Sequence, residues 1–149
     1  PMTRTRTLND VADELVALYY SQRASAGLII TEGLPVSEEG RGYLYTPGLY
    51  NEAQMHGWRK VTDAVHAKGG RIFAQLWHVG RMSHVSVLPE NQAPVSSGTI
   101  PATNTIVFAY SDSGEPSAVT PSIPRALETE EVKRVTKDFV KSARLAIEF

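Results

Sequence analysis

The chain has 149 residues and no cysteine. Disulfide bonds and thiolate chemistry are therefore excluded, and the composition fits a reducing, cytoplasmic location. The apolar runs are too short to cross a bilayer, and the first residues lack the apolar segment of a signal peptide. Neither sign of charge dominates, because 15 basic and 16 acidic residues give a net charge of -1. Nothing in the charge favours a nucleic acid or an anionic membrane as partner.

Several motifs of cofactor binding and catalysis are also absent. The sequence contains no G-x-G-x-x-G, no P-loop and no Gly-x-Ser-x-Gly elbow. The four histidines are His56, His66, His78 and His84. No pair of them has the spacing of a zinc or iron site, so we expect no metal. We interpret His78 as a structural residue that bonds the backbone of a strand and a loop.

What the sequence does contain is an alternation of helices and strands. Helices are predicted over residues 10–25, 52–68 and from 130 to the end, and strands over 27–31 and 71–77. Asn9 or Asp10, Asn51 and Thr129 stand at N-cap positions, and Gly69 can supply a left-handed C-terminal residue. Two strands separated by a helix predict a parallel βαβ unit with a right-handed crossover.

Each predicted helix has an apolar stripe that we expect to face the core. The stripes are Val11, Leu15, Leu18 and Tyr19 in the first helix, Met55, Trp58, Val61 or Thr62, and Val65 in the second, and Val132, Val135, Phe139, Ala143 and Ile147 in the third.

Residues 81–125 differ from the rest because they hold six of the nine prolines. We predict a long loop excursion there, with one short strand at 105–110. Met2 and its neighbours can end an earlier strand. The order strand, helix, strand, helix, strand, loop, helix predicts an α/β fold, the N-terminal portion of a (β/α)8 TIM barrel with about three of its eight strands. A whole barrel takes roughly 250 residues, so residues 1–149 are expected to form a partial domain, truncated at both ends.

The stretch Arg71–Arg81 is the most informative part of the sequence. An apolar strand ends there in a polar and aromatic cluster, and in α/β folds ligands bind at the carboxyl ends of parallel strands. Gln75 and Trp77 alternate with Leu76, so both should point to one side of the sheet. The carboxamide can offer a donor and an acceptor to a flat heterocycle, and the indole can form an apolar wall. Equally, they can be a hydrogen-bonded core glutamine beside a core tryptophan.

The segment Gln75-Leu-Trp-His-Val-Gly-Arg81 resembles a strand and loop of the old yellow enzyme family, the FMN-dependent ene-reductases, in its classical branch. Further matches follow in the family's order, and the resemblance covers nearly all of the chain, thinning between about Val95 and Pro121. They are Pro1-Met-Thr-Arg4, Tyr19-Tyr20, Gln22-Arg-Ala-Ser-Ala-Gly27, Leu28-Ile-Ile-Thr-Glu-Gly33, Gly42-Tyr43, Thr46-Pro-Gly48 and Trp58-Arg-Lys-Val-Thr-Asp-Ala-Val-His66.

The resemblance implies roles for seven residues. Those that would bind FMN are Pro1, Met2, Thr3, Gly33 and Gln75, and those that would line the substrate pocket are Trp77 and Tyr43. The residues by themselves leave plainer readings open. Thr3 can be an exposed terminal threonine, Gly33 a strand-ending glycine, and Tyr43 a loop anchor. Glu32 is interpreted as a structural hydrogen-bonding residue.

The implied activity is reduction by NAD(P)H, through FMN, of the C=C bond of α,β-unsaturated carbonyl or nitro compounds. The resemblance implies no catalytic residue within this chain; the His/His or His/Asn pair and the proton-donating tyrosine are expected after Phe149. The alternative is a non-catalytic fragment, or a half-barrel interaction module that needs a partner chain. The choice of NADH or NADPH, the physiological substrate and the oligomeric state stay open.

Overall fold

The computed structural model describes residues 1–148, and the chain divides into two compact units. Unit 1 comprises Pro1–Val36, Tyr45–Trp77 and the described residues from Asp138. Unit 2 comprises Ser37–Leu44 and His78–Lys137. Each unit is described by itself below.

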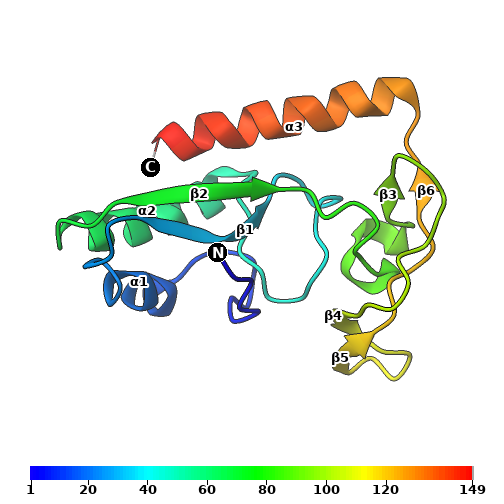
Figure 1. Cartoon of the computed structure of the whole chain (residues 1–149), viewed down its shortest axis with the longest axis horizontal. Helices are drawn as coiled ribbons and strands as arrows, with labels where there is room; N and C mark the ends of the chain where they lie inside the picture. Colours follow the sequence, from blue (N-terminus) through cyan, green and yellow to red (C-terminus); the bar gives the residue numbers. More distant parts are fainter. Residues whose placement is uncertain (149) are drawn as a thin grey trace. The chain divides into compact units, whose positions relative to one another are not determined.

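Unit 1 is built on a βαβ arrangement. It contains α1 (Glu14–Ser21), β1 (Ile29–Pro35), α2 (Glu52–His66) and β2 (Ile72–Trp77). The two strands pair in parallel, as the sequence predicted, and Figure 1 shows them side by side. The earlier strand predicted around Met2 is wrong, because residues 1–7 form no strand. The Arg4 amide donates to a side chain of β1 and Thr5 has a φ of 52°, so this segment does not continue in an extended ladder.

The first helix is shorter than predicted and begins later. Its N-cap is Asp13, whose carboxylate accepts from the amide of Val16, and not Asn9 or Asp10. Those two residues adopt positive φ angles of 58° and 56° in a turn, a conformation that asparagine and aspartate tolerate. The predicted inward stripe is only partly confirmed, because Tyr19 packs against the core but two other members do not. Leu15 and Leu18 are largely exposed, and the buried residues of α1 are Val16, Ala17, Tyr20 and Ser21.

The second helix follows its local signals. The Asn51 side chain caps it by accepting from the amide of Gln54, and Gly69 has the left-handed φ of 74°. The Gln54 side chain reaches back to the amide of Tyr50, one residue before the cap. The predicted stripe is confirmed, since all of its members are buried: Met55, Trp58, Val61, Thr62 and Val65.

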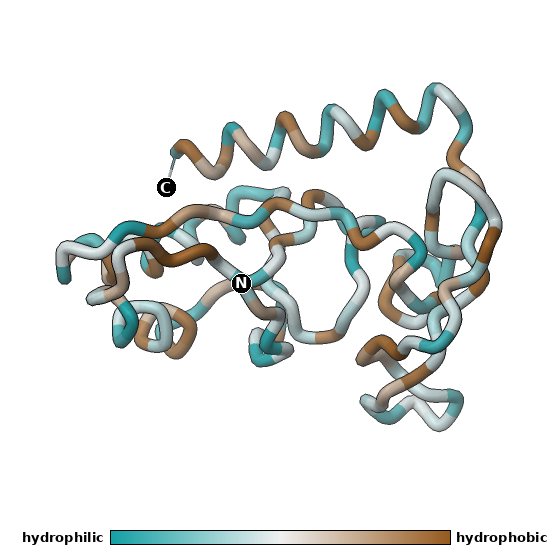
Figure 2. Tube along the Cα trace, in the orientation of Figure 1, coloured by the Kyte–Doolittle hydropathy of each residue, from teal (hydrophilic) through white to brown (hydrophobic). Residues whose placement is uncertain are grey.

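The core of unit 1 lies between these helices and the strand pair. Trp58, Val61, Val65, Leu34 and Leu49 are fully enclosed, with exposed fractions of 0%. Figure 2 shows the start of β1 as a continuous hydrophobic stretch. The strand pair is less covered at the register pair Ile30 and Phe73, whose exposed fractions are 43% and 65%.

The third helix, α3 (Thr129–Glu148), begins in unit 2 and ends in unit 1. It begins at Thr129 itself, so the predicted cap is displaced by one residue: the Glu131 carboxylate accepts from the amide of Glu128. Its predicted stripe is only partly covered. Ile147 and Val132 are 84% and 50% exposed, and the other members, Val135, Phe139 and Ala143, are half-buried. Outside the predicted stripe, Ser142 is buried and Leu145 and Ala146 pack on the unit 1 core. Within residues 1–148 no helix is long and apolar enough to span a membrane.

Unit 2 holds residues 81–125, which contain more regular structure than the single strand predicted. A hairpin joins β4 (Val107–Tyr110) to β5 (Pro116–Val119), and β3 (Val95–Ser96) pairs in parallel with β6 (Arg125–Ala126). Two 3-10 turns, η1 (Val85–Val87) and η2 (Pro89–Asn91), precede them. The predicted strand at 105–110 is confirmed as β4. The partners β3 and β6 lie far apart in sequence, which is why apolar periodicity did not reveal this pair.

Candidate functional site

The site is built around a bulge in β1. The register of the strand pair runs from Ile30↔Phe73 directly to Gly33↔Gln75, so two residues of β1 face one residue of β2. The two bulge residues of β1, which have no register partner of their own, are Thr31 and Glu32, and both are buried with 1% exposure. A bulge of this kind re-aims side chains locally. Here it lies near the carboxyl ends of two parallel strands, the edge at which α/β folds bind ligands.

Thr31 uses its side chain to hold the backbone of Gln75. Its hydroxyl accepts from the Gln75 amide at 2.9 Å and donates to the Glu32 carbonyl at 2.7 Å. The hydroxyl thus takes the place of a ladder carbonyl where the bulge interrupts the register. This bond fixes the position of Gln75 on β2.

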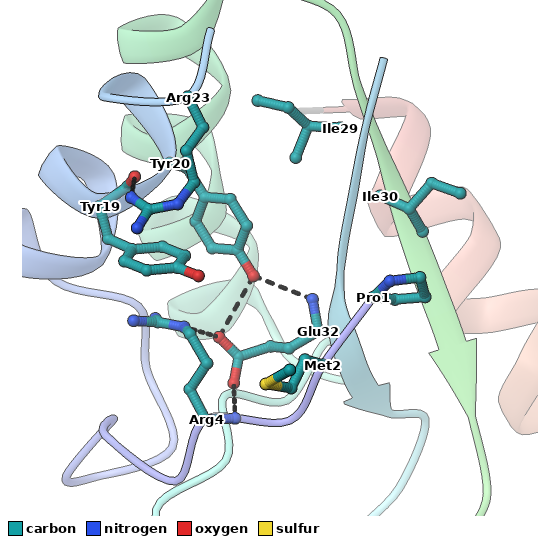
Figure 3. Close-up of a pocket in the computed structure, with 9 residues that line it drawn as sticks. All are labelled: Pro1, Met2, Arg4, Tyr19, Tyr20, Arg23, Ile29, Ile30 and Glu32. Atoms are coloured by element: carbon teal, nitrogen blue, oxygen red, sulfur yellow. Dashed lines mark hydrogen bonds and ion pairs between the residues drawn. The ribbon is translucent and has the colours of Figure 1, made fainter. Parts of the chain in front are cut away.

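Glu32 ties the first residues of the chain to β1. Its carboxylate accepts from the Arg4 Nε at 3.0 Å, the Arg4 amide at 3.4 Å and the Tyr20 hydroxyl at 3.2 Å (Figure 3). The Tyr20 hydroxyl in turn accepts from the Glu32 amide at 2.9 Å. Burial, followed by the adjacent Glu32 carboxylate, raises the pKa of Tyr20 above its ordinary value. The interpretation of Glu32 as a structural residue is confirmed.

Arg4 also stacks on an aromatic ring. Its guanidinium carbon lies 3.8 Å from the centroid of the Tyr19 ring, and that of Arg23 lies 3.6 Å away. Figure 3 shows the two guanidinium groups on opposite faces of this ring. Pro1 and Met2 line the same cavity, of about 290 Å³. The contacts of Arg4 with Glu32 and Tyr19 therefore hold in place the first three residues of the chain, which are three of the predicted flavin contacts.

Two of these predicted contacts have side chains available to a ligand. Within the described residues, the Thr3 hydroxyl and the Gln75 carboxamide make no hydrogen bond, and both residues are partly exposed. A short chain of contacts links them: Thr3 precedes Arg4, Arg4 bonds Glu32, and Glu32 precedes Gly33, the register partner of Gln75. A hydroxyl and a carboxamide are donor and acceptor groups that suit the polar edge of an isoalloxazine ring. The residues present therefore fit a flavin.

Gly33 lies against an aromatic ring, but one from the protein itself. A Cβ atom built on Gly33 would lie 2.3 Å from the Cδ2 atom of Trp77. The indole thus leans back from the end of β2 over β1. Trp77 and Gly33 form one local arrangement at the strand ends.

The remaining predicted residues lie in unit 2. Tyr43 stands between Gly42, whose missing side chain leaves room for Met82 and Val79, and Leu44, whose amide donates to the Phe108 carbonyl at 2.8 Å. His78 accepts from the Gly80 amide through Nδ1 at 3.1 Å, which confirms its structural reading.

Sequence reasoning missed the contacts that position the candidate site. Arg4 and Glu32 are 28 residues apart, and Tyr20 and Glu32 are 12 apart. No helical or strand periodicity links such positions. The only local signal was a buried strand with a threonine and a glutamate inside it, Thr31 and Glu32, which is typical of a strand that needs unusual hydrogen-bond partners.

Comparison with known families and proteins gives one consistent result. Residues 1–149 match the NADH:flavin oxidoreductase / NADH oxidase family. The 12-oxophytodienoate reductase 1 of Oryza sativa subsp. japonica is 42% identical over 149 residues, covering 99% of this chain and 37% of that protein. The putative 12-oxophytodienoate reductase-like protein 1 of Arabidopsis thaliana is 41% identical, with coverage of 99% and 43%. The chain therefore spans about two fifths of these relatives.

Solved structures agree with this. Morphinone reductase in complex with tetrahydroNAD superposes with a TM-score of 0.96 at 47% identity, covering 99% of this chain and 41% of that one. The old yellow enzyme homologue from Zymomonas mobilis superposes with a TM-score of 0.89 at 42% identity, with coverage of 99% and 39%. The fold of this chain is thus one that larger solved proteins contain.

Proposed function

Because the chain belongs to the NADH:flavin oxidoreductase / NADH oxidase family, we propose that it forms the flavin-edge portion of an FMN-dependent ene-reductase barrel. The remaining barrel would come from further sequence of the complete protein or from a partner chain. The observation that carries the proposal is the Gln75 carboxamide, free of hydrogen bonds within the described residues and held by the Thr31 hydroxyl at the ends of two parallel strands.

In this proposal each residue has a defined task. Gln75 would pair with the pyrimidine edge of FMN, and the backbone of Pro1, Met2 and Gly33 would lie along the ring. The Thr3 hydroxyl would donate to the flavin carbonyl next to the reacting ring, where negative charge collects on reduction. One such hydrogen bond contributes about 1 kcal/mol, enough to move a redox potential measurably.

Bound FMN supplies hydride transfer, from NAD(P)H to the activated C=C bond of an α,β-unsaturated carbonyl or nitro compound. Trp77 would exclude water and wall one side of the substrate, and Tyr43 is proposed as a second wall residue. The groups that hold the substrate oxygen and protonate the product are proposed to lie beyond residue 149. These 149 residues would bind FMN and orient the substrate, while protonation of the product would belong to the rest of the protein.

A second candidate function is an interaction module that needs a partner chain. It is favoured by the apolar side chains left uncovered on the strand pair and α3, where Phe73, Ile30 and Ile147 are 65%, 43% and 84% exposed. Large exposed apolar patches mark surfaces that another element covers. The rest of a barrel would satisfy the same surface, so both candidates require additional structure there.

A single purification distinguishes them. We would express the complete protein that contains these residues, record its visible spectrum, and follow NADH and NADPH oxidation with 2-cyclohexenone under anaerobic conditions. The proposal expects flavin absorbance, FMN on extraction, and the saturated ketone as product. A folded, colourless protein that cannot be reconstituted with FMN would reject the enzyme and leave the interaction module.

A further inference from the structure

The indole of Trp77 occupies the space that a side chain at position 33 would need. A Cβ atom on Gly33 would lie 2.3, 2.4 and 2.6 Å from Cδ2, Cε2 and Cε3 of Trp77. All three are atoms of the six-membered part of the indole, so its broad face lies over Gly33. Carbon atoms in ordinary contact are about 3.5–4.0 Å apart. No side chain fits at position 33 while the indole stays where it is.

The register explains how the two residues meet. Trp77 is opposite Pro35, and Gly33 is two residues earlier on β1. Residues two apart on a strand share a face, so Gly33 and Pro35 both lie on the side toward which the indole leans. The Trp77 ring is therefore directed from β2 toward the preceding residues of β1, and it packs directly on the backbone of Gly33.

Space is the reason for glycine here, since the backbone does not require it. Gly69, Gly80 and Gly114 have positive φ angles, and Gly33 does not. Gly33 is buried and forms a regular register pair with Gln75. An alanine could adopt this backbone conformation, and the three nearest atoms that its Cβ would meet all belong to Trp77.

We propose that Gly33 is a positioning residue that sets the orientation of Trp77, and through it the size of substituent that the substrate pocket accepts. This rests on the proposed function for the role of Trp77, while the coupling between the two residues rests on geometry alone. The substrate class affected is activated alkenes with a substituent on the C=C bond. With alanine at position 33 the indole must move by more than about 1 Å to restore normal carbon contacts, and it can move only away from β1.

Two readouts test this, and the first needs neither FMN nor activity. The complete protein is labelled with 5-fluorotryptophan, and the Trp77 resonance is assigned by its loss in Trp77→Phe. Gly33→Ala should move the Trp77 resonance and leave that of Trp58, which is fully buried in the core, in place. Gly27→Ala is the matched control, because a Cβ atom there has nothing within 4 Å. It should move neither resonance.

The second readout is the ratio of kcat/KM for 2-cyclohexenone and 2-methyl-2-cyclohexenone. Gly33→Ala should change this ratio by on the order of tenfold to a hundredfold, the effect of a wall displaced by about 1 Å. Gly27→Ala should leave it unchanged. In a Trp77→Ala background, Gly33→Ala should add no further change, because the residue that transmits the effect is gone.

Three results would overturn the proposal: an unmoved Trp77 resonance in Gly33→Ala, an undiminished selectivity change in the Trp77→Ala background, or failure of Gly33→Ala and of the double variant alike to fold. If Gly33→Ala alone does not fold and the double variant does, the steric coupling is supported. A wild-type protein without FMN or turnover would reject the proposed function, and the fluorine spectra would still decide the coupling.

Discussion

Replacing Arg4 by alanine removes the main partner of a buried carboxylate. The Glu32 side chain has 0% exposure, and the Arg4 side chain has 15%. Without the Arg4 Nε, the partners left to the carboxylate among residues 1–148 are the Tyr20 hydroxyl at 3.2 Å and the Arg4 amide at 3.4 Å. Breaking a buried pair on one side costs about 3–5 kcal/mol, because the remaining charge stays desolvated. The stacking on Tyr19 adds about 0.5–2 kcal/mol to the loss.

The assay is chemical denaturation of the complete protein together with its FMN dissociation constant. Arg4→Ala should lower the free energy of unfolding by about 3.5–7 kcal/mol, the broken pair and the lost stacking together. It should also weaken FMN binding, since Thr3 is positioned by its neighbour. The double variant Arg4→Met/Glu32→Leu should recover most of the stability, because an apolar pair leaves no buried charge. Lys60→Ala, which removes an exposed ion pair with Glu14, is the control and should have little effect.

A loss below about 1 kcal/mol in Arg4→Ala, the size found for exposed ion pairs, would refute the reasoning. It would mean that water reaches Glu32 in solution. Equal losses in Arg4→Ala and in the double variant would also refute it, because the cost would then not come from the stranded charge.

Three further predictions concern other parts of the chain. Trp77→Ala in the complete protein should change the preference among bulky enones with little loss of flavin; loss of flavin with unchanged selectivity would contradict the assigned role. The hydrogen bonds from Arg125 lower the pKa of Glu131 to about 2; because the folded value is depressed, this cap of α3 stabilises the protein above about pH 4.5 and is lost as the pH falls toward 2. A carboxyl chemical-shift titration should show this midpoint and its rise in Arg125→Ala, and a midpoint near 4.5 in the unaltered protein would contradict it. Residues 1–149 expressed alone should be aggregation-prone and bind FMN weakly or not at all, because open strand edges and Phe73 stay uncovered; a monodisperse monomer with a sharp unfolding transition would contradict this.

The parts of the fold that the sequence predicted correctly depend on neighbours in sequence. Asn51 and Gln54 lie within one helical turn, and Gly69 follows the same helix, so the second helix and its buried stripe were predictable. The two strands were predictable from short apolar runs, although β1 continues to Pro35, four residues beyond the expected end. The bulge accounts for this, because it lets Thr31 and Glu32 be buried inside a strand with side-chain partners of their own.

The parts that were missed depend on distant residues. Asp13 replaced Asn9 or Asp10 as the cap because those residues form a turn with positive φ. The apolar stripe of α3 was expected to face inward. A helix face is buried only where another element packs against it, and Ile147 is 84% exposed. In the site, Thr3, Gly33, Gln75 and Trp77 were proposed from the sequence. The ion pair of Arg4 with Glu32 and the contact of Trp77 with Gly33 became visible only in the structure.

The central claim is that these residues form the polar edge of an FMN site, and the FMN affinity of Gln75→Ala tests it most directly. Dissociation constants would be measured by flavin fluorescence on the deflavinated complete protein, beside Gln92→Ala, which removes a carboxamide from an exposed position. The account predicts that Gln75→Ala weakens FMN binding by roughly tenfold, the effect of about 1.4 kcal/mol from lost hydrogen bonds, while Gln92→Ala binds like the unaltered protein. Equal affinity in all three proteins would contradict the placement of the flavin at the ends of β1 and β2.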